Sequence, residues 1–535
     1  MLFFPTADQD FQYFRSRGYT GSLNDMHYKA MGDLGYTGSL NDRIHAYLIS
    51  EYGSFYEAMR DLRNGTSVFS LSYIFNGFNP SLVFDFKNNY FRKSATNSTF
   101  PASITHAATT NATMVDSDGL LKWRPHNILT HSGDLTNAGW TKLRITLATG
   151  QNDFEGNPTA VKITPTAVSG SHVFYKATSA SNLVNGILST LTIDLKADGY
   201  NFFSVASENN RYAVINLSDG TVSLNAGSVS PTVTSLGNGW YRCSITSSLN
   251  QQEVFSVVET PQAANHGATT FTGDGTSGVL VAYPHSIRSD LGGMVNNPDR
   301  GDSYVPTTTA PVYLSRRGHH IYNGSAWVNE GILHESEART NLFTYSNTFT
   351  NSAWAKTNMT VTANQATGLD GAVSASKIAI GGTSSTSYCI NSTASTTGTL
   401  SYFAKQNTER FFVVDRGPYS EGDYAIFDLS NGTISKSPTF SGSSAHITPM
   451  GNGWYRCVLQ SAQGTSTNAF TISGSGTNLT TATSGTIYLW GAQFEVGSTP
   501  SSYIPTTSAT VTRAAETLTV PAANLPYNST NMSIQ

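Results

Sequence analysis

Apolar and polar residues alternate over short runs along most of the chain, and turn residues separate these runs. One run covers 212–217, turns through Ser218-Asp219-Gly220 and leaves through 221–224, which is the pattern of a β-hairpin. The same pattern recurs at 428–434, and further β-rich runs cover 187–195, 201–206, 240–245, 254–258 and 279–283. Because many short strands follow one another without long helices between them, the pattern predicts a mainly β protein with two-sheet antiparallel sandwiches of jelly-roll type.

The sandwich pattern occurs twice. Trp140 and Trp354, Trp240 and Trp454, and Cys243 and Cys457 are each 214 residues apart, and the run 237–243 recurs letter for letter at 451–457. The copies also end alike, at 303–308 and 502–507, now 199 residues apart, so the first copy carries about 15 extra residues, which we place around 286–300. A repeat of this length governs the fold and predicts two tandem jelly-roll-like modules.

The repeat and the pattern around it divide the chain into six segments. We expect a helical anchor domain at 1–65, a β connector at 66–126, module 1 at 127–310, a second β connector at 311–340, module 2 at 341–513, and the start of a further β unit or a tail at 514–535.

The first 65 residues have a helical pattern instead. The octapeptide at 18–25 recurs at 35–42, and each copy places an Asp three residues after a Ser, a variant of the capping box. Apolar residues then recur at helical spacing over 44–62, so a small helical bundle is predicted. Two interpretations remain open, an independent small domain or an anchor that docks onto a larger assembly. The candidate anchor residues are Tyr19, Leu23, Tyr36 and Leu40.

The amino-acid composition limits the kinds of binding partner that we expect. Charged residues make up 12% of the chain, about half the usual share, and 31 Lys and Arg against 35 Asp and Glu leave a net charge of -4. Binding a phosphate backbone needs clustered cations, so we expect no nucleic-acid partner. No apolar run is long enough to span a bilayer and no cationic signal segment opens the chain, so we expect neither membrane insertion nor export. Cys243, Cys389 and Cys457 show no C-x-x-C spacing and are expected to be reduced and buried.

Motifs that carry catalysis or metal binding are missing from the sequence. It contains no G-x-S-x-G elbow, no H-E-x-x-H helix and no phosphate-cradling glycine loop, so we expect no enzyme, no catalytic residue and no cofactor. A catalytic pair of carboxylates for glycoside hydrolysis remains an alternative, because the two residues of such a pair can be far apart in sequence. Asp274 offers one carboxylate where calcium needs several oxygens, so a turn is expected there. His319-His320 fits a hairpin arm better than a metal site, and Arg300-Gly301-Asp302 is discounted as a chance match to a cell-adhesion tripeptide.

The order of motifs in the two copies suggests a family. A module begins with Asn-Leu, as at 341–342, and continues with Gly-Asn-Gly-Trp-Tyr-Arg, at 237–242 and 451–456. Gly-Asp-Gly-Thr-Ser-Gly follows at 273–278 in the first copy, and Ser-Tyr-Ile-Pro-Thr-Thr ends the second copy at 502–507. Over about residues 81–515 the chain resembles the carbohydrate-binding-type sandwich modules of tail and fibre proteins of tailed bacteriophages. The octapeptide repeats are similar to those of phage structural proteins.

The resemblance implies a jelly-roll fold and a virion protein made in the host cytoplasm. It further implies attachment to other virion proteins through the N-terminal helices, a homo-oligomer with a trimer favoured, and recognition of the host surface, with a glycan as the expected ligand. Two alternatives are kept: a capsid or neck decoration protein without a ligand, and a polysaccharide-degrading tailspike whose catalytic part is not recognised.

Five residues are candidates for glycan contact. Alternation puts Trp240 and Arg242 on the face opposite the core, and Trp454 and Arg456 repeat them in the second copy. Each pair is open to two interpretations: a platform on which a sugar ring stacks, or a buried Trp with the Arg stacked on it in a structural cation–π pair. The fifth candidate, Trp490, lies in a run that the second copy keeps and the first replaces with Tyr-Pro-His at 283–285, so the second copy is the better candidate for binding.

Overall fold

The computed structural model describes a few residues near the N-terminus (26, 28–29, 32–33 and 37) and then residues 82–525, without 94–95, 178–186, 208–210, 249–251, 262–269, 382–386, 418–422 and 480–481. The described chain is mainly β, and its sheets are antiparallel, so these two expectations are confirmed. The helical bundle expected at 1–65, with Tyr19, Leu23, Tyr36 and Leu40, lies outside the described residues apart from those few positions. No helix among the described residues combines the length and the apolar character needed to cross a bilayer.

The chain divides into two compact units. The first consists of Met1–His106, Asn329–Ile332 and Thr517–Gln535, and the second of Ala107–Val328 and Leu333–Glu516. The elements of the first unit are β1 (Val83–Asp85), β2 (Tyr90–Lys93), β3 (Thr96–Ser98), α6 (Phe100–Ser103), β4 (Thr105–Ala107), β35 (Thr517–Thr519) and the short 3-10 helix η2 (Ala522–Asn524). Its core is a group of phenylalanines in which Phe91 meets Phe86 and Phe100 edge-on, with ring centroids 5.7 and 5.6 Å away.

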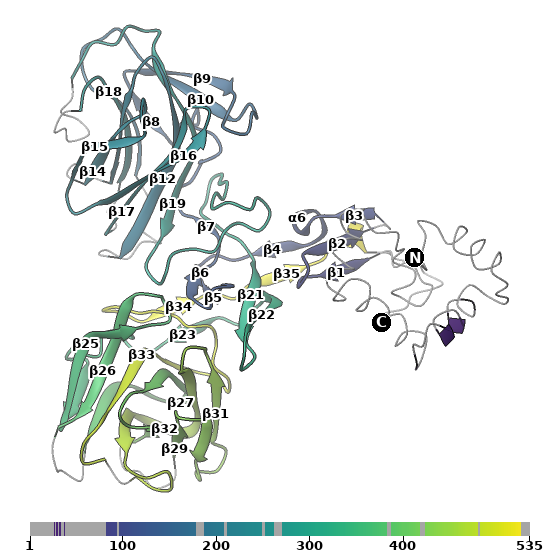
Figure 1. Cartoon of the computed structure of the whole chain (residues 1–535), viewed down its shortest axis with the longest axis vertical. Helices are drawn as coiled ribbons and strands as arrows, with labels where there is room; N and C mark the ends of the chain where they lie inside the picture. The colour runs from purple at the N-terminus through teal and green to yellow at the C-terminus, as the bar shows by residue number, and fades with distance from the viewer. Residues whose placement is uncertain are drawn as a thin grey trace. The chain divides into compact units, whose positions relative to one another are not determined.

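The second unit contains module 1 (127–310), module 2 (341–513) and the connectors (107–126, 311–328 and 333–340) (Figure 1). Module 1 has two six-stranded sheets, in the orders β16-β17-β12-β19-β10-β9 and β15-β14-β13-β18-β11-β8. Its strands are β8 (Thr141–Leu143), β9 (Ile145–Gln151), β10 (Ala160–Pro165), β11 (His172–Ala177), β12 (Leu188–Asp198), β13 (Phe202–Ser207), β14 (Tyr212–Asn216), β15 (Thr221–Ala226), β16 (Ser230–Gly237), β17 (Trp240–Ser248), β18 (Gln252–Val258) and β19 (Gly278–Arg288).

The two sheets of module 1 share one apolar core. Ile193 and Leu195 of β12 enter it from one sheet, and Phe203 and Val205 of β13 enter it from the other. Residues two apart along a strand point to the same face, so each sheet contributes every second side chain to a β-sandwich-like core. The hairpin expected from the alternation at 212–224 is present as β14 and β15, which pair from Tyr212 with Ala226 to Asn216 with Thr221.

Module 2 repeats this arrangement with longer strands. Its ten strands form one sheet in the order β25-β26-β33-β27-β32-β28-β29-β30, while β24 pairs with β27 and β31 with β32. The long strands β27 and β32 carry register shifts and pair with strands of both layers, so they join the two layers into one folded sheet. The strands are β24 (Trp354–Thr357), β25 (Met359–Thr367), β26 (Val373–Ile380), β27 (Tyr388–Gln406), β28 (Phe411–Arg416), β29 (Tyr424–Asp428), β30 (Thr433–Lys436), β31 (Ser444–Pro449), β32 (Trp454–Ser473) and β33 (Thr486–Glu495).

Both modules use the same internal hydrogen bonds at their starts. Asn127 donates its amide to the carbonyls of Pro284 and Val305, at 3.4 and 2.8 Å. Asn341 donates to the carbonyls of Ala492 and Ile504, at 3.0 and 2.8 Å. The indoles of Trp140 and Trp354 each donate to the carbonyl nine residues earlier, at 3.0 Å. The sequence repeat is therefore also a repeat of buried polar contacts.

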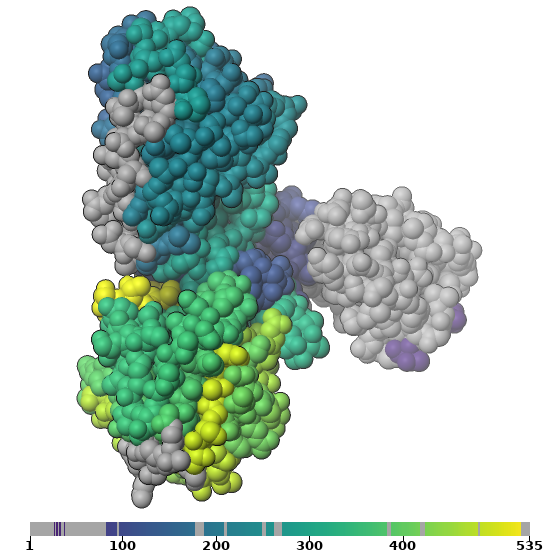
Figure 2. Space-filling model, turned by 60° about the vertical axis from the view of Figure 1, so that its left-hand side comes forward, coloured from purple at the N-terminus to yellow at the C-terminus, as the bar shows by residue number. Residues whose placement is uncertain are grey.

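The connectors lie where the two modules meet. They contain β5 (Thr113–Val115), β6 (Leu121–Trp123), β20 (Val312–Tyr313) and β21 (Arg316–Tyr322), while β22 (Trp327–Leu333) continues from them. β7 (His126–Asn127) pairs with β20, and β23 (Arg339–Asn341) pairs with β34 (Val511–Arg513), so each module is tied to a connector at its start. Figure 2 shows the C-terminal part of module 2, in yellow, at the boundary between the teal module 1 and the green module 2.

The three cysteines are free and buried, as expected from their spacing. Burial raises the pKa of each thiol, that of Cys389 to about 12, so the reactive thiolate is scarce in the folded chain. We expect the native chain to leave a thiol reagent such as dithionitrobenzoate unreacted, and the urea-unfolded chain to titrate all three thiols. A thiol that reacts before unfolding would contradict this packing.

Candidate binding site

The three candidate tryptophans are buried. Trp240 and Trp454 are each 2% exposed, and Trp490 is 0% exposed. Trp454 donates its indole N–H to the Thr367 carbonyl at 3.2 Å, and Trp490 donates to the Ser374 hydroxyl at 2.9 Å. A ring with so little exposed surface offers no face on which a sugar can stack, so the structure places none of the three at a binding surface.

The structure brings Trp454 and Trp490 together and leaves Trp240 apart. Trp454 and Trp490 share an apolar cluster with Phe403 and with Val115 and Leu121 of the connectors. Trp240 packs in module 1 against a separate cluster that contains Ala160 and Ala282. The second-copy tryptophans therefore fasten module 2 to the connectors.

The two candidate arginines stack on phenylalanines instead of on the tryptophans. The Arg242 guanidinium holds the Asp194 carboxylate through two hydrogen bonds of 2.8 Å and lies 5.8 Å from the Phe154 ring centroid. Arg456 lies 5.2 Å from the ring centroid of Phe403. The arginines of both copies therefore form their cation–π contacts with a phenylalanine, so the interpretation of a Trp–Arg cation–π pair is replaced by a Phe–Arg pair.

Three other motifs have structural roles in the described chain. The Asp274 carboxylate accepts hydrogen bonds from the backbone of Thr276 and Ser277, at 2.8 and 2.7 Å, which makes the expected turn. Arg300 pairs with Asp302 of its own tripeptide at 3.2 Å. His319-His320 lies in β21, where the His319 ring accepts a backbone hydrogen bond from β5, and the described residues include no cluster of three metal-ligating side chains.

A cavity of about 220 Å³ lies where the connectors meet the bases of both modules. Its wall comes from segments far apart in sequence: Asn111 before β5, Trp123 at the end of β6, Arg288 at the end of β19, Tyr313 in β20, and Arg513 in β34. Sequence reasoning missed this site, because these five residues are not part of a motif that the two copies share, and the shared motifs that also reach the wall, such as 502–507, gave no sign that they line a cavity. The sequence feature that could have indicated a cavity here is the presence of aromatic residues, such as Trp123 and Tyr313, in otherwise polar connectors.

The polar groups of the cavity are held in place by their neighbours. Arg288 lies over the Trp123 ring, 4.1 Å from its centroid, and donates through Nε and Nη2 to the Asp290 carboxylate at 2.8 and 2.9 Å. Asp290 also accepts the Trp123 indole N–H at 2.9 Å. The Tyr313 ring stacks against the His126 ring with centroids 6.1 Å apart, and the His126 Nε2 lies 3.2 Å from the Asn111 amide. The cavity wall is therefore largely pre-formed.

Two arginines and no carboxylate line the cavity, although one of them, Arg288, is paired with Asp290. Burial, together with the neighbouring His285, Arg288 and Arg124, lowers the pKa of His126 to about 3, so the ring is neutral at physiological pH. Burial raises the pKa of Tyr313 to about 12, while the same two arginines act in the opposite direction. The residues that line the cavity include Arg288 and Arg513 but no carboxylate.

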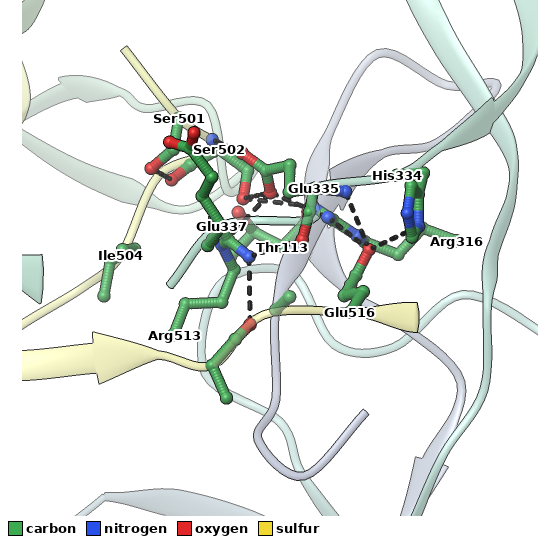
Figure 3. A network of polar contacts seen from close by, with 12 residues as sticks. Thr113, Arg316, His334, Glu335, Glu337, Ser501, Ser502, Ile504, Arg513 and Glu516 are labelled. Atoms are coloured by element: carbon green, nitrogen blue, oxygen red, sulfur yellow. Dashed lines mark hydrogen bonds and ion pairs between the residues drawn. The ribbon is translucent and has the colours of Figure 1, made fainter. Parts of the chain in front are cut away.

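Arg513 also belongs to a buried charge network, drawn in Figure 3. The Glu335 carboxylate accepts from Arg316 at 2.7 Å and pairs with Arg513 at 3.1 Å. The Glu516 carboxylate accepts from Arg316 at 3.0 Å and pairs with Arg124. Arg124, Arg316 and Glu516 are at most 3% exposed, so these ion pairs are shielded from water and hold four segments of the chain together.

The arrangement can hold a small polar ligand among fixed aromatic, amide and guanidinium groups. No protein-family model matches the chain, and no curated protein matches it. Function is therefore inferred from the fold, the cavity and the network.

We expect the second unit to lose stability as the pH falls from about 4.5 towards 2. Burial acts to raise the pKa of Glu335, but Arg316 and Arg513 outweigh it and lower this pKa from 4.5 to about 2. The folded pKa is below the ordinary value, so the stabilisation is complete above about 4.5 and disappears as the pH falls through the folded pKa. The loss amounts to about 3 kcal/mol at most.

Urea unfolding of the full chain at about pH 6 and about pH 2.5 measures this loss. Glu335→Gln removes the titrating group and should flatten the dependence, whereas Glu337→Gln, at a side chain that is 72% exposed, should leave it unchanged. An equal pH dependence in the wild type and Glu335→Gln would show that other carboxyls control acid unfolding.

Proposed function

We propose that this chain is a non-enzymatic, fibre-like structural protein of a tailed-bacteriophage virion that presents jelly-roll-like β-sandwich modules for recognition of a host-surface glycan. Its N-terminal helices attach it to other virion proteins, and it assembles as a homo-oligomer, with a trimer favoured. The virion location, the attachment and the oligomeric state are what the family resemblance of the motifs between about residues 81 and 515 implies.

The observation that carries the proposal is the duplication of one module on a common, rigid base. Asn127 and Asn341 make the same buried contacts, so the two modules are built alike. Both are fastened to connectors that contain a buried ion network and a pre-formed cavity. A repeated β module on a fixed base suits a protein that presents surfaces, because rigid scaffolds position binding groups without reorganisation.

A second candidate is a capsid or neck decoration protein without a ligand. The burial of Trp240, Trp454 and Trp490 favours it, since the aromatic residues that first suggested sugar stacking serve packing instead. The two candidates differ in one measurable property, the binding of a glycan by the full chain.

The test applies the labelled full chain to an array of bacterial surface polysaccharides and capsular oligosaccharides. Saturable binding to a defined set of glycans supports recognition, and no binding to any of them supports the decoration protein. Release of reducing sugar from a bound polysaccharide would instead support the tailspike alternative. Gold-labelled antibody against the chain on intact particles tests the virion location independently, and absence of label from the particles would contradict it.

A further inference from the structure

We propose that the cavity between the connectors and the module bases binds an acidic sugar unit, a monosaccharide residue that carries a carboxylate. This inference rests on the proposed recognition of a glycan and narrows its ligand class. It moves the binding site from the buried tryptophans to a wall that includes Asn111, Arg288 and Tyr313.

The size of the cavity limits the ligand to about one sugar ring. Its volume of about 220 Å³ is below the roughly 300–1,000 Å³ of pockets that enclose drug-sized ligands. Ile128, Ile504 and Pro505 contribute apolar surface to the wall, while Thr110 and Asn111 contribute polar surface. A pyranose matches this mixture, because it presents apolar C–H groups together with hydroxyls.

The charge of the wall favours a carboxylate. Arg288 binds Asp290 through Nε and Nη2, and its Nη1 makes no hydrogen bond within the described chain. Arg513 adds a second positive charge, although its Nη1 and Nη2 donate to the backbone carbonyls of Glu335, Glu337 and Ala514 and its Nε lies 3.1 Å from the Glu335 carboxylate. The network, Arg513 included, contains three arginines and two glutamates, so one positive charge remains. A ligand carboxylate would accept a charge-assisted hydrogen bond from Arg288.

Tyr313 gives a second, independent indication of a ligand. Its side chain is 6% exposed, and its hydroxyl makes no hydrogen bond within the described chain although it lies in the cavity wall. A hydroxyl at a cavity wall that no protein group satisfies is available to hydrogen-bond with a ligand or with water. A sugar hydroxyl can both donate to and accept from it.

Ligand-observed NMR titrations of the full chain test the inference. Glucuronic acid, galacturonic acid and N-acetylneuraminic acid are compared with glucose and galactose as neutral counterparts. We expect at least one acid to bind and the neutral sugars to bind about tenfold more weakly, since they lack the charge-assisted contact. Equal binding of acids and neutral sugars would overturn the inference, as would inorganic phosphate displacing the acid at equal concentration, which would mark a simple anion site.

Two variants locate the binding. Arg288→Gln should weaken binding of the acid about tenfold, and Tyr313→Phe should weaken it about threefold or more. Tyr313→Phe removes a hydroxyl without a partner in the described protein, so it keeps the test valid even if Arg288→Gln disturbs the fold. The matched controls are Tyr402→Phe, which removes an unpartnered buried hydroxyl in the core of module 2, and Arg410→Gln, at a side chain that is 51% exposed. Both controls should bind as the wild type does.

The outcomes also separate this inference from the proposed function. Glycan-array binding that survives both Arg288→Gln and Tyr313→Phe would leave the recognition function standing and overturn the cavity as its site. Loss of array binding in these two variants alone supports the cavity. If the wild type binds neither the array nor the acidic sugars, both proposals fail.

Discussion

Replacing Glu516 with glutamine is expected to lower the free energy of unfolding of the second unit by about 3–5 kcal/mol. The Glu516 carboxylate is 3% exposed and lies between two arginines that are themselves fully buried, Arg124 and Arg316. Glutamine keeps the size of the side chain but removes the charge, so both guanidiniums lose a counter-charge that water cannot replace. Urea unfolding of the full chain, followed by tryptophan fluorescence, measures the loss.

The network offers its own control. Glu337 pairs with Arg339 at 2.6 Å, but the Glu337 side chain is 72% exposed, so Glu337→Gln should change the free energy of unfolding by less than about 1 kcal/mol. Adding Arg124→Met to Glu516→Gln should recover part of the loss, because it removes the arginine whose carboxylate partner is lost, whereas Arg316 keeps its ion pair with Glu335. Similar small losses at Glu516 and Glu337 would mean that the network is hydrated and does not hold the connectors.

The alternation of apolar and polar residues was enough to predict the β architecture. The hairpin of β14 and β15 forms where the turn Ser218-Asp219-Gly220 predicted it, because strand period and turn chemistry are local properties. Because the sequence repeats, the architecture predicted for one module could also be predicted for the other. The equivalent hydrogen bonds of Trp140 and Trp354 illustrate this similarity. Local pattern and internal comparison therefore account for the sheets.

The candidate site depended on contacts that no local pattern contains. Alternation assigned Trp240 and Trp454 to the face away from the main core, and neither belongs to the central cluster of its module. It could not tell that other segments cover that face, such as the connector residues Val115 and Leu121 over Trp454. Period identifies the face of a strand on which a residue lies, and only tertiary packing decides whether that face is exposed.

The ion network was hidden for a related reason. Arg124 and Arg316 stand in the polar connectors and Glu516 follows module 2, so each of them resembles an ordinary surface charge in the sequence. Glu516 is some 200 positions from Arg316 and some 390 from Arg124. A low overall charge content made such a concentration of buried charge still less expected. These residues pair because the folded modules and connectors bring distant segments of the chain together. The amino-acid composition does not predict which segments meet.

Replacing Asn341 with aspartate is expected to destabilise module 2 by about 3–5 kcal/mol. The Asn341 side chain is 0% exposed and makes four hydrogen bonds, donating to Ala492 and Ile504 and accepting from the backbone N–H of Phe343 and Phe494 at 3.1 Å each. Aspartate has the same shape and keeps both acceptors, but it cannot donate, so two buried carbonyls lose their partners and face a carboxylate. The urea midpoint of the full chain, with near-ultraviolet circular dichroism as a second probe, measures the loss.

The repeat supplies both a replicate and a matched control for this substitution. Asn127→Asp should cost module 1 a comparable amount, because Asn127 makes the same four contacts. Asn431→Asp should be close to neutral, because the exposed Asn431 only accepts hydrogen bonds, from the backbone and hydroxyl of Thr433, and Asp219 occupies the equivalent turn of module 1 with the same two contacts. If Asn341→Asp were as mild as Asn431→Asp, the buried amide would not fix the module start. A loss at Asn341 without one at Asn127 would show that the two modules share a sequence pattern but differ in what stabilises them.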